Sequence, residues 1–313
     1  MYHSKSILGA TADFTTDMLQ LSTSPFLTHP KRNTHKICFL IHSLYKQIML
    51  KAMISTDKIK EDLRTRFIGR RLHVYDTVSS TNDVARALAL EGAEEGTVII
   101  AEAQTRGRGR AGREWFSPRG GLWFSIILKP KIKAREVSRI TLTVGVAVTA
   151  ALNRQFNLNA EVKWPNDVLV NGRKVCGVLT ESVTCDETVK MVVVGIGLNA
   201  NITLEKFSRS LRESATTLKE ELKKEVSLEP LLCEIFYHIE SEYVVFLKEG
   251  FAQVLSEWKA LAAFIGKHVK VTVVGRKFSG VAEDVDEDGS LIVRLSDGSV
   301  KRVVAGDVKV RIV

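Results

Sequence analysis

The sequence predicts an α/β (α+β) protein, in which a domain with a β-rich centre is followed by a small all-β domain. Three observations support this fold class. Apolar runs of strand length alternate with segments of helical periodicity over most of the chain. Asn171-Gly172 lies between two such runs and indicates a tight β-hairpin. From Gly266 onwards only short alternating segments occur, with turns expected at Asp288-Gly289 and Asp297-Gly298.

Helices are predicted where capping residues precede apolar residues at helical spacing. Thr56 and Asp57 can cap a short helix that runs to Phe67, and Asn82 precedes a helix that stops at Gly92. A long helix is expected over 137–156, with its apolar residues on one face. Two more helices are expected over 228–248 and 251–263. Strands are expected at 72–75, 97–103, 122–128, 160–164, 168–170, 175–183 and 189–198.

Length and composition are those of an ordinary globular protein. The 313 residues are 45% hydrophobic and 26% charged, which is enough material for one large and one small domain. We expect a catalytic domain at 53–264 and the β domain at 265–313. Residues 1–52 lack sustained periodicity and are expected to lie outside the core, as a transit peptide, a disordered arm or residues upstream of a start at Met53.

Charge and cysteine content bear on whether the protein binds nucleic acid, holds a metal ion or contains disulfides. The net charge is +9, of which +4 lies in residues 1–52, and a basic site for phosphate-bearing substrates explains the rest as well as DNA binding does. The four cysteines form no C-x-x-C pair and no zinc-ligand spacing. We therefore expect reduced thiols, a cytoplasmic protein and no metal ligands in the chain. No apolar run approaches the roughly 18–20 residues of a membrane span, so no membrane association is expected.

The most informative segment is 105–113, which contains four arginines and three glycines. Glycine lets a backbone approach a ligand closely, and arginine offers a planar fork of donors that matches carboxylate or phosphate. Such a loop after a strand suits an anionic intermediate, although a disordered basic loop or a nucleic-acid patch has the same composition. Lys163, at the end of a predicted buried strand, is a second candidate, because unpaired lysines are seldom buried.

Several motifs occur in an order that resembles the biotin protein ligases (biotin–[acetyl-CoA-carboxylase] ligases), in the form without an N-terminal DNA-binding domain. The resemblance covers about residues 55–313. It implies a catalytic domain with a central mixed sheet flanked by helices, as in class II synthetases, and a C-terminal SH3-like β-barrel. The matching segments are Ser80-Thr81-Asn82, Gln104 with GRGRAGR at 107–113, WFSP at 115–118, KWPND at 163–167, KVCGVL at 174–179 and GIGLNAN at 195–201.

The resemblance implies an ATP- and Mg²⁺-dependent reaction. Biotin and ATP would form biotinyl-5′-AMP, and biotin would pass to a lysine of a biotin carboxyl carrier protein. Lys163, Arg110 and Arg113 are implied as catalytic residues that act on the reacting carboxylate and the phosphates. Binding residues implied for biotin and the nucleotide are Ser80, Thr81, Asn82, Gln104, Arg108, Gly109, Arg110, Trp115, Lys163, Asn166, Lys174 and Asn199.

Local alternatives exist for several of these residues. Ser80, Thr81 and Asn82 could simply cap a helix, and Asn166 and Asn199 could simply form turns. Lys174 could be a solvated strand residue, and Trp115 could be ordinary core. Asp167 is the candidate general base for the acceptor lysine.

Other functions remain open at this stage. A lipoate ligase or octanoyltransferase is expected to share the catalytic fold, but the arginine–glycine loop and the C-terminal β domain favour biotin. A biotin-responsive DNA-binding repressor would need a recognition helix, for which residues 1–52 are short and poorly patterned, so no specific DNA is expected as a partner. An RNA-binding loop would interleave aromatic with basic residues, which 105–113 does not. The resemblance leaves homodimer formation open.

Overall fold

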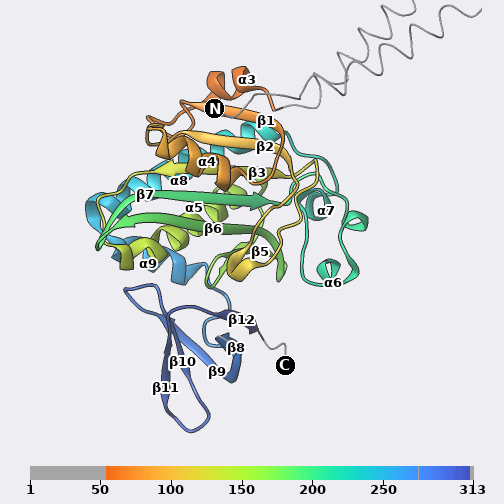
Figure 1. Ribbon diagram of the computed structural model, residues 1–313. Helices are drawn as coiled ribbons and strands as arrows, with labels where there is room; N and C mark the ends of the chain where they lie inside the picture. Colours follow the sequence, from red (N-terminus) through yellow and green to blue (C-terminus); the bar gives the residue numbers. More distant parts are fainter. Residues whose placement is uncertain (1–53, 274, 311–313) are drawn as a thin grey trace, which may run out of the picture. The chain divides into compact units, whose positions relative to one another are not determined.

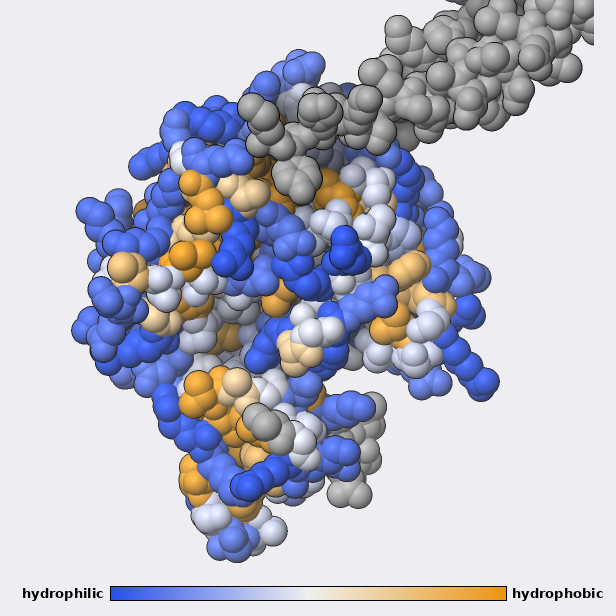
Figure 2. Space-filling view, viewed as in Figure 1, coloured by the Kyte–Doolittle hydropathy of each residue, from blue (hydrophilic) through white to orange (hydrophobic). Residues whose placement is uncertain are grey.

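The computed structural model of the chain describes residues 54–273 and 275–310 (Figure 1). The expectations for residues 1–52 therefore lie outside the described residues. Most of the face shown in Figure 2 is hydrophilic. None of the helices in the described ranges is long and apolar enough to cross a membrane.

A seven-stranded mixed sheet forms the framework of the larger part of the fold. Its strand order is β1-β2-β3-β7-β6-β5-β4. The first two strands run parallel, and all other neighbours are antiparallel. The strands are β1 (Leu72–Val78), β2 (Val98–Gln104), β3 (Leu122–Leu128), β4 (Ala160–Lys163), β5 (Asp167–Val170), β6 (Arg173–Cys185) and β7 (Thr188–Leu198).

Helices cover the two faces of this sheet unequally. One face packs against α5 (Val137–Phe156), which contacts α8 (Leu228–Glu249) and α9 (Phe251–Ala260). On the other face, α4 (Thr81–Leu90) packs through Ala85 and Ala89 against a smaller apolar cluster. The remaining helices are short: α3 (Thr56–Asp62), η1 (Arg110–Gly112), η2 (Ala134–Glu136), η3 (Leu204–Lys206), α6 (Arg209–Arg212) and α7 (Leu218–Leu222).

The C-terminal part is a five-stranded antiparallel sheet with the order β11-β10-β9-β8-β12. The two predicted turns are present, and Gly289 and Gly298 have φ angles of +78° and +83°. The strands are β8 (His268–Val273), β9 (Arg276–Val285), β10 (Leu291–Arg294), β11 (Val300–Val303) and β12 (Asp307–Val310).

Two predicted helices, α3 and α9, end earlier than expected, and a third, α5, is more buried than expected. The first ends at Asp62 instead of Phe67, because the Glu240 carboxylate accepts the backbone N–H groups of residues 66–68 and holds that segment away from helical geometry. The helix α9 ends at Ala260 rather than residue 263. Buried residues surround much of α5 rather than one face, since it lies between the sheet and two other helices.

The predicted hairpin at Asn171-Gly172 is confirmed. Both residues have positive φ, 51° and 73°, as a two-residue turn between β5 and β6 requires. This turn sends the chain from the Lys163–Asp167 segment directly to Lys174. It therefore brings two of the sequence motifs into neighbouring strands.

Candidate active site

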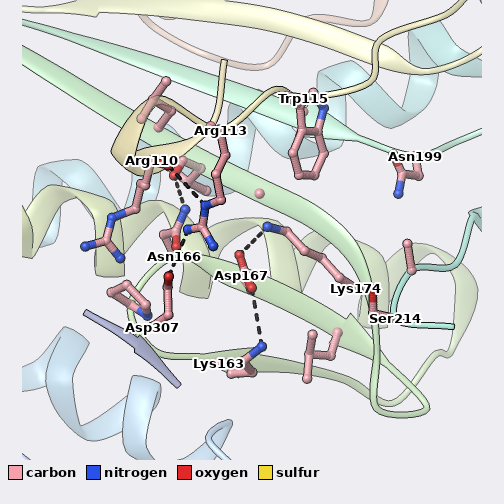
Figure 3. Close-up of a pocket in the computed structure, with 18 of the residues that line it drawn as sticks. Arg110, Arg113, Trp115, Lys163, Asn166, Asp167, Lys174, Asn199, Ser214 and Asp307 are labelled. Atoms are coloured by element: carbon pink, nitrogen blue, oxygen red, sulfur yellow. Dashed lines mark hydrogen bonds and ion pairs between the residues drawn. The ribbon is translucent and has the colours of Figure 1, made fainter. Parts of the chain in front are cut away.

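A single cavity of about 830 Å³ contains every residue that the sequence analysis placed in the site. It lies against β6 and β7 of the seven-stranded sheet, and residues of the C-terminal sheet complete its wall (Figure 3). The predicted residues in its lining are Ser80, Thr81, Asn82, Gln104, Arg108, Gly109, Arg110, Arg113, Trp115, Lys163, Asn166, Lys174 and Asn199. Residues as far apart in the sequence as Ser80 and Asn199 thus converge on one space.

One end of the cavity is a network of hydroxyl and amide groups at the start of α4, and the Glu181 carboxylate accepts a hydrogen bond from the Asn82 amide at 2.7 Å. Ser80 occupies the N-cap position, but its side chain makes no capping bond. The Gln104 Oε1 atom accepts a hydrogen bond from the Thr81 backbone N–H at 2.8 Å. The Ser125 hydroxyl donates to the Asn82 Oδ1 atom at 2.6 Å. These side chains are held by one another and do more than cap a helix.

The arginine-rich loop folds back on itself, and its first cavity-lining arginine, Arg108, binds acidic groups. The Gly109 N–H donates to the Arg113 carbonyl at 2.7 Å, which closes the loop. The Arg108 guanidinium donates to both Asp83 carboxylate oxygens, at 2.7 and 2.8 Å, and pairs with Glu181 at 3.2 Å. These carboxylates fix the Arg108 side chain in the cavity wall.

Two other arginines of the same loop contact the C-terminal part of the chain. Arg113 forms an ion pair with Asp307 at 2.8 Å, and the Arg110 guanidinium donates to the Gly306 carbonyl at 3.4 Å. Burial lowers the pKa of Arg110 from its ordinary value. Within the described part of the chain, no carboxylate lies within 4.0 Å of the Arg110 guanidinium. This half-buried cation therefore suits an anionic ligand.

Asp167 bridges the two lysines of the site (Figure 3). Its carboxylate lies 3.5 Å from the Lys163 Nζ atom and 2.5 Å from the Lys174 Nζ atom. The side chains are 22%, 14% and 28% exposed for Lys163, Asp167 and Lys174. Lys163 was singled out as an unpaired buried lysine, and the structure instead gives it a partner. The arrangement leaves two cations against one anion, so the group carries a net positive charge.

Trp115 forms a flat wall between the lysines and the sheet. The Lys174 Nζ atom lies 4.7 Å from the centroid of its ring, within cation–π range. Its ring packs edge-on against Trp123, with the centroids 6.5 Å apart. The ring also rests on Gly177 and Gly197, where a Cβ atom would approach it to 3.0 and 2.4 Å. Both glycines are needed for this close approach.

Asn166 and Asn199 both brace neighbouring backbone. The Asn166 amide donates to the Val178 carbonyl at 2.7 Å, and the Asn199 amide donates to the Thr216 carbonyl at 3.0 Å. Both residues therefore have a role in holding the local backbone. The Asn199 Oδ1 atom is nevertheless buried with no hydrogen-bond partner among the described residues, so it can still accept a bond from a ligand.

Comparison with known proteins gives two family matches that agree with this geometry. Residues 74–199 match the biotin/lipoate A/B protein ligase family, and residues 264–311 match the biotin protein ligase C terminal domain. The chain is 32% identical over 266 residues to the bifunctional ligase/repressor BirA of Bacillus subtilis, a match that spans 85% of this chain and 82% of that protein. The chain belongs to the biotin protein ligase family.

Two further relatives come from the same family. The biotin–[acetyl-CoA-carboxylase] ligase of Paracoccus denitrificans is 32% identical over 223 residues, 69% of this chain and 90% of that protein. The structure of the Aquifex aeolicus biotin protein ligase in complex with biotin and ATP superposes with a TM-score of 0.67 at 28% identity. It covers 77% of this chain and 99% of that one. The predicted family and fold class are thus confirmed.

Sequence reasoning missed several residues of the site in this biotin protein ligase family member. Ser125 is fully buried in a strand whose other residues are apolar, and this isolated polar residue was the available signal. Glu181 and Asp307 carry no comparable signal, because each matters through contacts with distant segments: Glu181 with Arg108 and Asn82, and Asp307 with Arg113. Gly195 and Gly197 lay inside a recognised motif, but their spatial role was not inferred.

Proposed function

We propose that this chain is an ATP-dependent biotin protein ligase. It activates biotin as biotinyl-5′-AMP with release of pyrophosphate, and then transfers biotin to a specific lysine of a biotin carboxyl carrier domain. The observation that carries the proposal is the convergence of Arg110, Lys163 and Lys174 on one cavity whose other end is lined by hydroxyl and amide groups. One end suits a neutral ring, and the other suits a carboxylate and phosphates.

The polar end suits the ureido ring of biotin. A ureido group both donates and accepts hydrogen bonds, and hydroxyl and amide side chains can do the same. Thr81, Asn82 and Gln104 supply these groups, and Ser125 orients Asn82 from β3. Gly195 leaves room for this arrangement, because a Cβ atom there would lie 2.2 Å from the Asn82 Oδ1 atom. We therefore place the biotin ring between α4 and strand β7.

The charged end suits the reaction itself. Activation brings the biotin carboxylate against the α-phosphate of ATP, and two like charges repel unless fixed cations lie where the charge develops. Lys163 on β4 and Lys174 on β6 flank β5, whose Asp167 pairs with both, so their ammonium groups are preorganised. We assign Lys163 to the α-phosphate, Lys174 to the biotin carboxylate, and Arg110 with Arg113 to the remaining phosphate charge.

The adenine ring is expected beside Trp115. An aromatic face suits a purine, and Phe116 and Phe207 form a neighbouring apolar pair with their ring centroids 5.6 Å apart. The unpartnered Asn199 Oδ1 atom can accept a hydrogen bond from the nucleotide. The nucleotide would thus bind between the arginine loop and the segment that contains η3 and α6.

Mg²⁺ is expected to enter as the ATP chelate. The described residues contain no group of three histidine, cysteine or acidic side chains arranged to hold a metal ion. Mg²⁺ commonly keeps several waters and binds largely through substrate phosphates, so a site whose arginines and lysines can hold those phosphates fits such a chelate. Bound there, the ion would help neutralise the phosphate charge.

The transfer step requires a neutral acceptor amine, whose ordinary pKa is about 10.4. Asp167 already contacts two ammonium groups, so we assign it first to positioning those lysines. Its role as the base that accepts the proton of the acceptor lysine stays a prediction from the sequence. Exclusion of water from the cavity would protect the mixed anhydride until the acceptor arrives.

We further propose a cytoplasmic location and no sequence-specific DNA partner. Cys176, Cys185 and Cys233 are free thiols, as is usual in a reducing compartment. Although the Bacillus subtilis relative is named a ligase/repressor, residues 1–52 lack the pattern of a recognition helix. Salt-sensitive binding to one operator sequence would contradict this. A homodimer stays open and can be tested by sedimentation with and without ligand.

Transfer of labelled biotin to a purified carrier domain tests the proposed function. We expect transfer that requires ATP and Mg²⁺ and that disappears when the acceptor lysine of the carrier is replaced by arginine. Lipoic acid and octanoate, offered in parallel with a lipoyl carrier domain, serve as competing substrates. Transfer of either acid together with failure of biotin would refute the proposal and favour the lipoate ligase alternative.

A further inference from the structure

Two contacts from the C-terminal part of the chain flank Lys163. The Val162 N–H donates to the Leu261 carbonyl at 3.1 Å. The Trp164 indole Nε1–H donates to the Gly289 carbonyl at 2.9 Å, and Trp164 is only 1% exposed. The residue before Lys163 and the residue after it are therefore both fixed by segments that follow α9.

These contacts lie where the sheet itself gives little support. Strand β4 is the last strand of the seven-stranded sheet and pairs only with β5. Lys163 is the final residue of β4, and Pro165 just beyond it has no N–H to donate. On the outer side of this strand end, the Leu261 carbonyl is the backbone partner of Val162, and the Trp164 indole adds a side-chain contact to Gly289.

The turn that supplies the Gly289 carbonyl is itself rigid. The Asp286 carboxylate accepts the backbone N–H groups of Asp288 and Ser290 at 3.0 and 2.9 Å. The Arg302 guanidinium pairs with Asp286 at 2.5 Å and with Asp288 at 2.7 Å. A turn with this many internal bonds presents its carbonyl in a fixed direction.

The same turn is also attached to α5. The Ser138 hydroxyl donates to the Asp288 carbonyl at 3.2 Å, and the Arg139 guanidinium pairs with the Asp288 carboxylate at 3.1 Å. At Gly289 a Cβ atom would lie 3.0 Å from the Leu142 Cδ1 atom. The turn therefore lies between the N-terminal end of α5 and the Trp164 indole, and a Cβ atom at Gly289 fits only if Leu142 or the turn moves by a few tenths of an ångström.

We propose that the β9–β10 turn, residues 286–290, is a positioning element for the activation step. It fixes the end of β4 through Trp164 and so sets the place from which the Lys163 ammonium reaches into the cavity. This inference rests on the proposed function. It gives the C-terminal sheet a role that needs no contact with substrate, and it makes Trp164 and Gly289 positioning residues. A displacement of about 1 Å at a catalytic group can slow a reaction about a hundredfold.

Gly289→Ala and Gly298→Ala form a matched pair that tests the proposal. Both glycines follow an aspartate in a turn of the C-terminal sheet, and their φ angles differ by only 5°, at +78° and +83°. Both substitutions therefore impose a similar backbone strain. A Cβ atom at Gly298 meets nothing within 4 Å, whereas one at Gly289 meets Leu142. Only Gly289→Ala should push the β9–β10 turn away from Trp164.

Single-turnover pyrophosphate release measures the activation step in the full-length variants. We expect Gly289→Ala to lower its rate about tenfold or more, with the KM for biotin changed by less than about threefold. Gly298→Ala should stay within about twofold of the unchanged protein. Ser138→Ala, a milder change that removes one tie of the turn, should give a smaller loss of rate in the same direction.

The reactivity of the Lys163 amine provides a second readout that a purely structural role would not move. Brief acetylation followed by peptide mass spectrometry reports how accessible each lysine is. We expect Lys163 to be acetylated several times faster in Gly289→Ala, while exposed Lys190 is unchanged in both variants and Lys163 is unchanged in Gly298→Ala.

Equal activation rates and equal Lys163 labelling in the two glycine variants would overturn the proposal. It would also be overturned if Gly289→Ala lowered the thermal stability but changed neither the activation rate nor the labelling of Lys163. If the unchanged protein forms no biotinyl-5′-AMP, the proposed function fails. The labelling comparison then still decides whether the turn positions Lys163.

Discussion

Adding one methyl group at Gly197 is expected to weaken nucleotide binding by moving Trp115. Gly197 lies in β7, which pairs on one side with Trp123 of β3 and on the other with Gly177 of β6. The backbone at this position is therefore held from both sides. A Cβ atom placed there would lie 2.4 Å from the Trp115 Nε1 atom and 2.6 Å from Cε2.

The magnitude follows from the space that the ring would need. Ordinary van der Waals contact begins at 3.4 Å, so the Trp115 ring must shift by about 1 Å, and it can shift only toward the cavity. Trp123 blocks its edge. Over-packing of this kind costs about 1–3 kcal/mol, and each 1.4 kcal/mol corresponds to a factor of ten. We expect the affinity for ATP to fall about 5- to 150-fold, and the affinity for biotin to fall less.

Isothermal titration with a nonhydrolysable ATP analogue and with biotin separates the two effects. Gly145→Ala is the control, because it adds the same methyl group inside α5, where the nearest atom is 3.8 Å away. A second test replaces Trp115 by leucine. Gly197→Ala added to Trp115→Leu should cost little more than Trp115→Leu alone, because the smaller side chain removes the clash.

An unchanged affinity for the ATP analogue in Gly197→Ala would refute this reasoning. An equal loss of ATP and biotin affinity would also contradict it, because only the aromatic wall is predicted to move. Simple additivity of the two substitutions would show that the methyl group acts through something other than Trp115.

Three further predictions concern the charged groups. Asp167→Asn should slow activation about 10- to 100-fold, because the neutral amide no longer holds the two lysines that it bridges. Arg110→Ala should slow activation about 100- to 1,000-fold, as expected for a lost cation at a developing charge, and Arg110→Lys should restore part of the rate. Burial and the nearby Glu257 raise the pKa of Glu242 from 4.5 to about 7. The folded state then binds this proton more tightly than the unfolded chain, so stability falls as the pH rises from about 4.5 to 7. Glu242→Gln should therefore raise the free energy of unfolding at pH 8 by about 1–2 kcal/mol, after allowance for solvent screening.

Each of these predictions has a defined counter-result. For Asp167 and Arg110 the measurement is single-turnover pyrophosphate release. Full activity of Asp167→Asn or of Arg110→Ala would contradict the role assigned to that residue. Loss of the melting transition would show that the variant tests folding instead. For Glu242 the measurement is urea unfolding at pH 4 and pH 8. A stabilisation that is equal at both pH values would show that titration of this carboxyl is not its cause.

The candidate site residues could be singled out from the sequence because each belongs to a local motif, and the structure brings them to one cavity, while their roles in binding and catalysis stay predictions. The bounds of α5 and β3 were predicted correctly, since apolar residues at helical spacing define α5 and a continuous apolar run of strand length defines β3. The end of α3 was not, because a carboxylate more than 170 residues away on α8 holds the segment that follows the helix. Asp307 was not singled out, and Gly289 was predicted only as part of a turn, for the same reason: their importance lies in contacts with distant segments.

The most direct test is native mass spectrometry of the purified protein after incubation with biotin, ATP and Mg²⁺ but without a carrier. The account predicts that the unchanged protein retains biotinyl-5′-AMP, and that Lys163→Ala at the same concentrations retains biotin with little or no adenylate. If Lys163→Ala accumulated the adenylate as fully and as fast as the unchanged protein, the assignment of Lys163 to the reacting phosphate would be wrong. If the unchanged protein retained none, the proposed activity would be contradicted.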